Sequence, residues 1–386
     1  MRHFDFLSDD ALRRLFHREP GHFAAGDDPG QLGVALGATL YIPASRQHLA
    51  RDIAKQAGRG VLSMVLCLED AVPDRDLQAA ECNLVTQLRE YAQTGASKPL
   101  VFVRVRNPEQ VPKLVTALGE HAGILTGFVL PKFTETSGAA FLDAVVGVSE
   151  QAGRSLLVMP VLESPDIIYA ENRISELLGV RDLLAKYPST IAAIRLGATD
   201  LSAVYGLRRS RDLTVYDVRV LADVIADVVN IFARADGSGY VVTGPVWEYI
   251  TSAERMFKPQ LRESPFIEHA DRGLRAELIA KDLDGLIREI ALDKANGLTG
   301  KTVIHPSHVA AVHALLVVTH EEYCDAVDIL DTGAGGGVAA SAYRNKMNES
   351  KPHTAWAGRI VQRAEMFGVA HESTSFVDLL GAGLNR

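Results

Sequence analysis

The segment Ser63–Asp70 (SMVLCLED) is a nearly unbroken apolar run that ends abruptly in two carboxylates. Seven other short runs along the chain have a similar form, and several are rich in β-branched residues. Strands that are buried on both faces of a parallel sheet have this composition. The other runs are Thr39–Ser45 (TLYIPAS), Leu100–Arg106 (LVFVRVR), Gly127–Lys132 (GFVLPK), Leu156–Ser164 (LLVMPVLES), Ala193–Asp200 (AIRLGATD), Tyr240–Trp247 (YVVTGPVW) and Lys301–Pro306 (KTVIHP).

Amphipathic stretches with helical spacing separate these runs. One of them places apolar side chains at Val218, Leu221, Ile225, Val228 and Phe232, which lie on one face of a helix. Eight alternations of strand and helix predict an α/β fold, a closed TIM (β/α)8 barrel. An open, doubly wound sheet is the alternative that the same pattern allows.

The flanks of the chain do not follow this alternation. We take residues 39–318 as the barrel and catalytic domain, preceded by an N-terminal extension over residues 1–38 with a loop at Gly26–Gly33. Residues 319–386 are expected to form a C-terminal helical appendage that acts as a lid or an oligomer contact. The glycine run Gly333–Gly337 within it is expected to be a hinge, because no strand leads into it and no Gly-Lys-Ser/Thr follows, as a phosphate loop would require.

The charge and composition of the chain argue against several kinds of partner and of cysteine site. The net charge of −8 and the lack of a long basic run argue against nucleic acid and against an anionic membrane as partners. No apolar run reaches the ~18 residues of a transmembrane helix. The N-terminus lacks the apolar core of a secretory signal, so we expect a cytoplasmic location. The three cysteines have the spacing of neither a disulfide framework nor a zinc site.

Charged residues gather where five consecutive predicted strands end. Catalytic groups of such barrels lie at the carboxyl ends of the strands, whereas the interior is filled with apolar side chains. These seven residues therefore predict an active site on one rim of the barrel. They are Glu69, Asp70, Arg104, Arg106, Lys132, Glu163 and Asp200.

A divalent cation is expected among these carboxylates, which would otherwise repel one another and take up protons. Glu163 and Asp200 end adjacent strands, ~4.8 Å apart, and can share one ion. Mg²⁺, or Mn²⁺ in its place, suits two carboxylates because the other coordination positions are filled by water and substrate. Such an ion would chelate a 2-oxo acid and stabilise its enolate.

The remaining charged residues are assigned to substrate and proton handling. Arg104 is expected to clamp a carboxylate or a developing oxyanion, with Lys132 and Arg106 as further substrate-binding cations. Glu69 and Asp70 are expected to bind metal-bound water, to orient Arg104 or to move a proton. Several of these residues also have a structural alternative. Glu69 or Asp70 is a possible cap of the helix that follows, Asp200 is a possible cap of the next helix, and Arg106 and Lys132 are possible ion-pair partners.

Seven motifs, in order, resemble the HpcH/HpaI aldolase and citrate lyase β-subunit family, which includes malyl-CoA and citramalyl-CoA lyases. The resemblance implies a TIM barrel that binds Mg²⁺, cleaves or forms a carbon–carbon bond through an enolate, and assembles as trimers or hexamers. The motifs are LYIPAS (40–45), LEDAVP (68–73), VRVRN (103–107), VLPK (129–132), VLES (161–164), LGATDLS (196–202) and GKTVIHP (300–306).

Carried over by position, the resemblance makes Glu163 and Asp200 the metal ligands and places Arg104 against the substrate carboxylate or enolate oxygen. It gives Glu69 and Asp70 supporting or proton-handling roles.

Several positions depart from the family pattern. Cys67 stands where the family usually has Asp, and Arg106 stands in place of Asn. The segment Ala170–Ser189 is expected to be a helical insertion that reshapes the pocket. Near the C-terminus the acyl-CoA lyases carry an Asp that a neighbouring subunit contributes, and we do not equate Asn348 or Glu349 with it. The use of a CoA thioester therefore stays open.

Three functions remain as candidates. The leading one is a Mg²⁺-dependent lyase or aldolase acting on a small oxo or hydroxy acid or its CoA thioester. The second candidate uses the same site for a different reaction, either acyl-CoA thioester hydrolysis or phosphoenolpyruvate-type chemistry. The third is a non-catalytic, metabolite-binding subunit of a larger complex.

Overall fold

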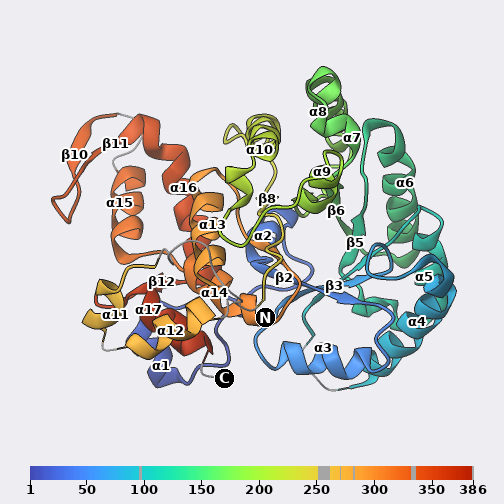
Figure 1. Cartoon of the computed structure of the whole chain (residues 1–386), viewed down its shortest axis with the longest axis horizontal. Coiled ribbons are helices and arrows are strands. Elements are labelled where there is room, and N and C mark those ends of the chain that lie inside the picture. Colours follow the sequence, from blue (N-terminus) through green and yellow to red (C-terminus); the bar gives the residue numbers. More distant parts are fainter. Residues whose placement is uncertain (95–97, 251–260, 270, 281–282, 332–335, 385–386) are drawn as a thin grey trace.

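Eight parallel strands form a closed barrel in the computed structural model, which describes residues 1–94, 98–250, 261–269, 271–280, 283–331 and 336–384 (Figure 1). The sheet order is β8-β7-β6-β5-β4-β3-β2-β9. The ring closes where Gly244 N donates to Gly300 O (3.1 Å) and Thr302 N donates to Gly244 O (3.0 Å). The predicted TIM barrel is confirmed, and the open sheet is wrong. The strands are β2 (Ala38–Pro43), β3 (Ser63–Cys67), β4 (Leu100–Arg104), β5 (Gly127–Leu130), β6 (Leu157–Leu162), β7 (Ile194–Leu196), β8 (Val242–Thr243) and β9 (Lys301–Val303).

The strands are apolar throughout because both of their faces are covered. Every residue of β3, β4, β5 and β6 is buried. Alternate side chains fill the lumen and pack under the outer helices. All eight predicted strands are present, each shorter than its apolar run, so the charged residues that end the runs lie at or just beyond the strand ends.

Helices surround the barrel (Figure 1). The segment that we expected to be an insertion, Ala170–Ser189, contains α8, which packs against α6 and α10. It is therefore the outer-ring helix between β6 and β7, and the expectation that it reshapes the pocket is not supported. The main helices are α3 (Leu49–Ala57), α4 (Leu77–Gln93), α5 (Gln110–Leu118), α6 (Glu135–Ala152), α8 (Ala170–Leu184), α10 (Arg219–Phe232), α13 (Leu283–Ala295) and α14 (Ser307–Leu316).

Shorter helices fill the connections between these elements. The longest is α12, and α9 follows β7 directly. Their bounds are α7 (Pro165–Ile168), α9 (Ala198–Ala203), α11 (Ser264–Glu268) and α12 (Arg272–Ala280), with 3₁₀ turns at Asp74–Asp76, Gly119–Ile124 and Val215–Asp217.

The two ends of the chain pack together outside the barrel. Strand β1 (Phe16–Arg18) pairs antiparallel with β12 (Val369–Ala370). The predicted loop Gly26–Gly33 is wrong in its second half, because α2 (Pro29–Ala35) begins there. Its start has a proline at the first helical position and the Asp28 side chain accepts from Gln31 N (3.1 Å), which is a standard helix start.

The C-terminal segment is mostly helical, as expected, with a short hairpin at its edge. Figure 1 shows that hairpin at the periphery of the molecule, beyond α15 and α16. The predicted hinge Gly333–Gly337 lies largely outside the described residues, and the division of the chain into three segments stays a prediction. The elements are α15 (His320–Asp331), β10 (Val338–Ala340), β11 (Met347–Glu349), α16 (Ser350–Phe367) and α17 (Phe376–Leu384), with α1 (Asp9–Leu15) at the other end.

Within the described parts of the chain, no helix combines the length and the apolar character needed to cross a bilayer.

Candidate active site

The charged residues expected at the rim do converge, and we call them the rim cluster: Glu69, Asp70, Arg104, Lys132, Glu163 and Asp200. Arg104, the last residue of β4, lies at its centre. Its Nη2 is 2.8 Å from Glu69 Oε2, 2.8 Å from Glu163 Oε1 and 3.3 Å from Asp70 Oδ2. One guanidinium therefore links carboxylates that follow β3 and β6.

Lys132 joins the cluster through both its side chain and its backbone. Its Nζ is 2.7 Å from Glu69 Oε1 and 3.8 Å from Asp70 Oδ1, and its backbone N–H donates to Glu163 Oε1 (2.9 Å). The residue has φ +47°, a left-handed conformation that is uncommon for a side chain with a Cβ. The turn lies directly after Pro131, and within it the Lys132 N–H points to Glu163.

Glu163 follows β6 directly and is 3% exposed. Burial raises the pKa of its carboxyl to about 7, against the favourable charge of Arg104 and with a further upward contribution from Asp200. Both of its recorded hydrogen bonds fall on Oε1. Oε2 lies beside Gly197, where a Cβ would come within 2.2 Å of it. Glycine at position 197 therefore makes room for this oxygen.

Asp200 lies in the first turn of α9, three residues after Gly197, and is partly exposed. Its negative charge raises the pKa of both Glu163 and Asp70. The short helix α9 thus brings the second expected metal ligand to the same rim as the first.

Glu69 and Asp70 influence each other's pKa in opposite directions. Burial would raise the pKa of Glu69, but its hydrogen bond with Asp70 and the charges of Arg104 and Lys132 hold it at about 2. Burial and the neighbouring Glu69 raise the pKa of Asp70 to about 6. The Asp70 side chain is 53% exposed, so a proton on it can exchange with solvent or substrate.

The donor set of the rim cluster fits a hard divalent cation. Four carboxylates face two cations, and the most buried carboxylate, Glu163, has a raised pKa that a positive charge would lower. In the described part of the chain, no group of three or more His, Cys, Asp or Glu side chains is arranged to hold a metal. Mg²⁺ needs only one or two carboxylates, because water and substrate complete its shell.

Arg106 does not join the cluster. Its Nε donates to Leu68 O (2.7 Å) and its Nη2 to Glu69 O (3.3 Å) and Val72 O, while Nη1 pairs with Asp74. All of these partners belong to the loop after β3. The expectation that Arg106 contacts substrate is not supported by this placement. Its geometry suits a residue that fixes the loop carrying Glu69.

Two polar residues beneath the cluster, Tyr41 on β2 and Arg195 on β7, were not expected from the strand ends. Arg195 is 1% exposed, and its guanidinium carbon lies 5.5 Å from the centre of the Tyr41 ring. The signal was present, since AIRLGATD contains one arginine in an otherwise apolar run. Whether that arginine enters the barrel interior depends on which face of β7 points into the lumen.

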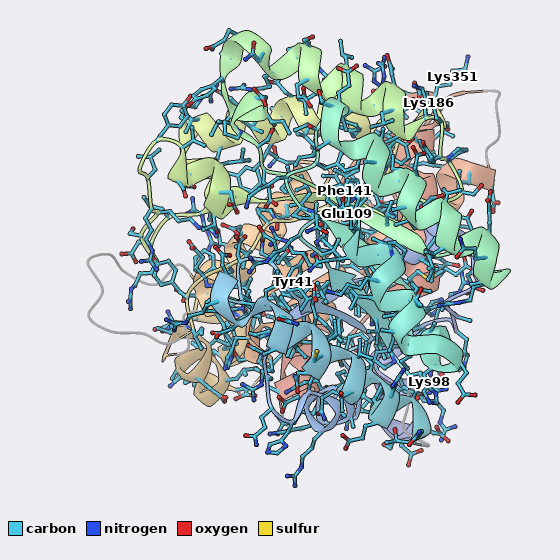
Figure 2. The ribbon with its side chains drawn as sticks, turned by 90° about the vertical axis from the view of Figure 1, so that its right-hand side faces the viewer. Tyr41, Lys98, Glu109, Phe141, Lys186 and Lys351 are labelled. Carbon is cyan, nitrogen blue, oxygen red and sulfur yellow. The ribbon has the colours of Figure 1, made fainter. Side chains whose placement is uncertain are left out.

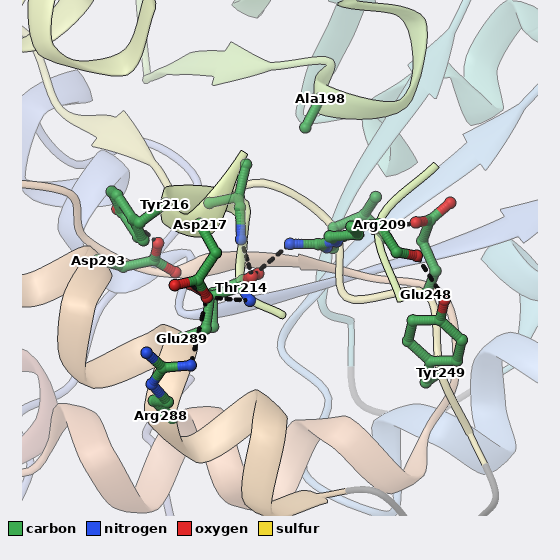
Figure 3. Close-up of polar contacts among 12 residues, drawn as sticks. Ala198, Arg209, Thr214, Tyr216, Asp217, Glu248, Tyr249, Arg288, Glu289 and Asp293 are labelled. Carbon is green, nitrogen blue, oxygen red and sulfur yellow. Dashed lines mark hydrogen bonds and ion pairs between the residues drawn. The ribbon is translucent and has the colours of Figure 1, made fainter. Parts of the chain in front are cut away.

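A second group of charged residues lies in the core, and we call it the core network: Arg209, Glu289, Asp293 and Lys301. Figure 3 labels the first three of them. Lys301 Nζ is 2.9 Å from Glu289 Oε1 and 2.7 Å from Asp293 Oδ2, and Arg209 pairs with Glu289. All four residues are buried. Tyr216 donates to Asp293 Oδ1 (2.8 Å).

Comparison with known proteins places the chain in a family. A model described as C–C bond lyase of the TIM-barrel fold matches residues 30–369. The chain belongs to this family. The C–C bond lyase match extends beyond the barrel at both ends, into α2 and to β12. The search of curated proteins found no match.

Two solved structures share the fold of this chain. A citrate lyase from Burkholderia xenovorans has a TM-score of 0.58 and 17% identity, over 91% of this chain and 96% of that one. The protein CitE from Mycobacterium tuberculosis, in complex with magnesium, acetoacetate and coenzyme A, has a TM-score of 0.51 and 19% identity, over 86% and 99%. At these identities the likeness establishes the fold that the two proteins share with this chain.

Proposed function

We propose that this C–C bond lyase depends on Mg²⁺ and cleaves or forms a bond next to the carbonyl of a small oxo or hydroxy acid. The observation that carries the proposal is the charge balance of the rim cluster, which has two more carboxylates than cations. A dication held by Glu163 and Asp200 restores neutrality at the most buried point of the site. CitE, a structural neighbour, was solved with magnesium and acetoacetate.

When bound, the metal would supply Lewis-acid polarisation of the substrate carbonyl. The chain's own residues supply the rest. Arg104 is held between Glu69 and Glu163 and presents a fixed positive charge to a carboxylate or enolate oxygen. Lys132, half exposed, offers a second cation to the substrate. Asp70, with a pKa of about 6, is the group best suited to take up or release a proton near neutral pH.

A basic hollow beside β2 supports the thioester form of the substrate. A cavity of about 620 Å³ is lined by Arg46, His48, Arg51, Lys55 and Asp52, from the loop after β2 and from α3. The phosphate groups of coenzyme A in such a thioester would be attracted to this excess of positive charge. We propose CoA thioesters as the first substrates to try.

The test is metal binding by calorimetry with Mg²⁺, on the wild type and on Glu163→Gln and Asp200→Asn. Both variants should lose Mg²⁺ binding and keep the fold, as judged by circular dichroism. Asp182→Asn, which removes one partner of an exposed ion pair on α8, is the matched control and should bind as the wild type does. Wild-type affinity in either site variant would refute the proposed ligands.

Product analysis then separates the candidate reactions. Acetyl-CoA with glyoxylate and pyruvate with an aldehyde are the two pairs to compare, and release of free thiol without a new carbon–carbon bond would indicate thioester hydrolysis instead. A homotrimer or hexamer and a cytoplasmic location stay predictions, the first open to light scattering.

A further inference from the structure

Arg195 is a cation in a place where barrels are normally apolar. It lies in the lumen, since its side chain meets Met159 of β6, Thr302 of β9 and Tyr41 of β2, which surround the barrel interior. Such interiors are usually filled with bulky branched side chains. The residue is 1% exposed, so neither solvent nor a surface partner compensates its charge.

No carboxylate pairs with Arg195 in the described part of the chain. Its recorded polar contacts are Thr302 Oγ1 at 2.6 Å and Met159 Sδ at 3.5 Å, and its Nε has no hydrogen-bond partner there. Burial lowers its pKa, and the charge of Arg104 lowers it further. Lys301, equally buried, is held by two carboxylates. A methionine or leucine would fill the same space without burying a charge, so packing does not explain Arg195.

Tyr41 connects this buried cation to the site. It is partly exposed and shares a face of β2 with Thr39, which is buried and bonded to Ser63. Figure 2 labels Tyr41 near the centre of the view. Tyr41 pairs in register with Val65, two residues before Cys67, and Cys67 pairs with Arg104, so Tyr41 lies one layer below Arg104 on the same inward face of the sheet, beside Arg195.

The chemistry of the pair fixes the direction of its hydrogen bonds. A guanidinium has donors and no acceptor, so between the two neighbouring groups only the Tyr41 oxygen can accept a hydrogen bond. The O–H of Tyr41 is then free to donate toward the rim. Burial raises the pKa of Tyr41, so the hydroxyl keeps its proton at neutral pH.

We propose that Tyr41 is a further catalytic residue, which donates a hydrogen bond from the barrel floor to the substrate oxygen on which negative charge develops, and that Arg195 is the positioning residue that polarises its hydroxyl. The inference rests on the proposed function, since it assigns a contact within that same site. Preorganised donors of this kind act most strongly in a site that excludes water.

The experiment measures binding of oxalate and of pyruvate in the presence of Mg²⁺ by calorimetry. Oxalate has the planar, doubly charged shape of the pyruvate enolate, whereas pyruvate represents the ground state. Tyr41→Phe should bind oxalate about tenfold more weakly or worse, with a smaller loss for pyruvate and with Mg²⁺ binding unchanged. Tyr187→Phe, which removes an exposed hydroxyl bonded to Asp143, is the matched control.

Arg195→Met tests the positioning role. It should weaken oxalate binding less than Tyr41→Phe does, and the double variant should be no weaker than Tyr41→Phe alone, because Arg195 acts through the hydroxyl. Additive losses would overturn that role. If Arg195→Met fails to fold, Arg195→Lys should bind oxalate between the wild type and Tyr41→Phe, and wild-type affinity in it would count against the inference.

The outcomes separate this inference from the function on which it rests. Wild-type oxalate affinity in Tyr41→Phe would overturn the inference and leave the metal site standing. A wild type that binds neither Mg²⁺ nor oxalate would overturn the proposed function itself. Once a substrate is found, kcat of Tyr41→Phe should fall by about 10²-fold with little change in KM.

Discussion

The rim cluster and the core network contain the same kinds of residue and differ in the balance and the exposure of their charges. In the core network two cations meet two carboxylates and all four side chains are buried, while Arg209 also lies 3.8 Å from the partly exposed Glu248. In the rim cluster four carboxylates meet two cations, and Asp70 and Lys132 are 53% and 55% exposed. The buried charges of the first group are all paired, with Tyr216 O–H and Val215 N–H as further donors to its carboxylates. The rim cluster keeps an excess of negative charge close to solvent. This excess distinguishes a site for a cation and an anionic substrate from a structural group of ion pairs.

Removing a cation from the core network should have the largest effect. Lys301→Met leaves Glu289 and Asp293 buried with one cation between them, and we expect a loss of about 3–5 kcal/mol in the free energy of unfolding. Arg104→Met in the rim cluster should cost less stability, because water reaches Asp70 and Lys132. Guanidinium unfolding of both variants makes the comparison, and a larger loss for Arg104→Met would reverse it.

The pH dependence of stability provides the second comparison. The pKa of Glu163 is raised to about 7 from an ordinary value of 4.5, so the folded protein binds a proton more tightly than the unfolded chain. Without metal, stability should therefore fall as pH rises from about 4.5 to 7. Mg²⁺ should reduce that fall, and Glu163→Gln should remove the part of it between about pH 6 and 7, because the pKa of Asp70, raised to about 6, contributes at lower pH. Thermal denaturation across this range is the measurement, and a fall of unchanged size between pH 6 and 7 in Glu163→Gln would exclude Glu163 as its source.

A single methyl group should disturb the rim cluster selectively. Gly197→Ala brings a Cβ within 2.2 Å of Glu163 Oε2 and 2.4 Å of Glu163 Cβ, so the carboxylate must move. We expect Mg²⁺ affinity to fall by about tenfold, equivalent to ~1.4 kcal/mol. Gly147→Ala on α6, where a Cβ meets nothing within 4 Å, is the control and should bind Mg²⁺ normally. Equal affinity in the two variants would show that Glu163 tolerates displacement.

The smallest effect is expected at Arg106. Arg106→Gln removes donors to Leu68 O, Glu69 O and Val72 O, so the loop carrying Glu69 should loosen. We expect a few-fold loss of activity, a stability loss of about 1 kcal/mol, and unchanged Mg²⁺ binding. A rise in KM alone, with kcat and stability intact, would instead restore the substrate-binding role expected from the sequence.

The barrel and the rim were predictable from the sequence for one physical reason. Parallel strands buried on both faces are apolar along their whole length, so a charge marks where a strand ends, and all parallel strands end on one rim. Glu69, Arg104, Lys132 and Glu163 could be placed together on that basis alone.

Other features depend on geometry that strand ends do not encode. Arg106 and Arg104 are two residues apart on one strand run, yet only one reaches the cluster, because β4 ends at Arg104 and the chain turns. Arg195 and Tyr41 lie within apolar runs, and their contact requires the barrel to be closed. The helix α2, by contrast, was readable from Asp28 and Pro29, since a cap and a proline at the first turn mark a helix start.

The most direct test of the central claim is a crystal structure of the protein with Mn²⁺ and oxalate, with anomalous scattering to locate the metal. We predict one Mn²⁺ bound by the Glu163 and Asp200 carboxylates, with oxalate completing its coordination beside Arg104 and within reach of the Tyr41 hydroxyl. An anomalous peak elsewhere, or an intact rim cluster with no metal at saturating Mn²⁺, would contradict the assignment of this rim as a metal-dependent active site.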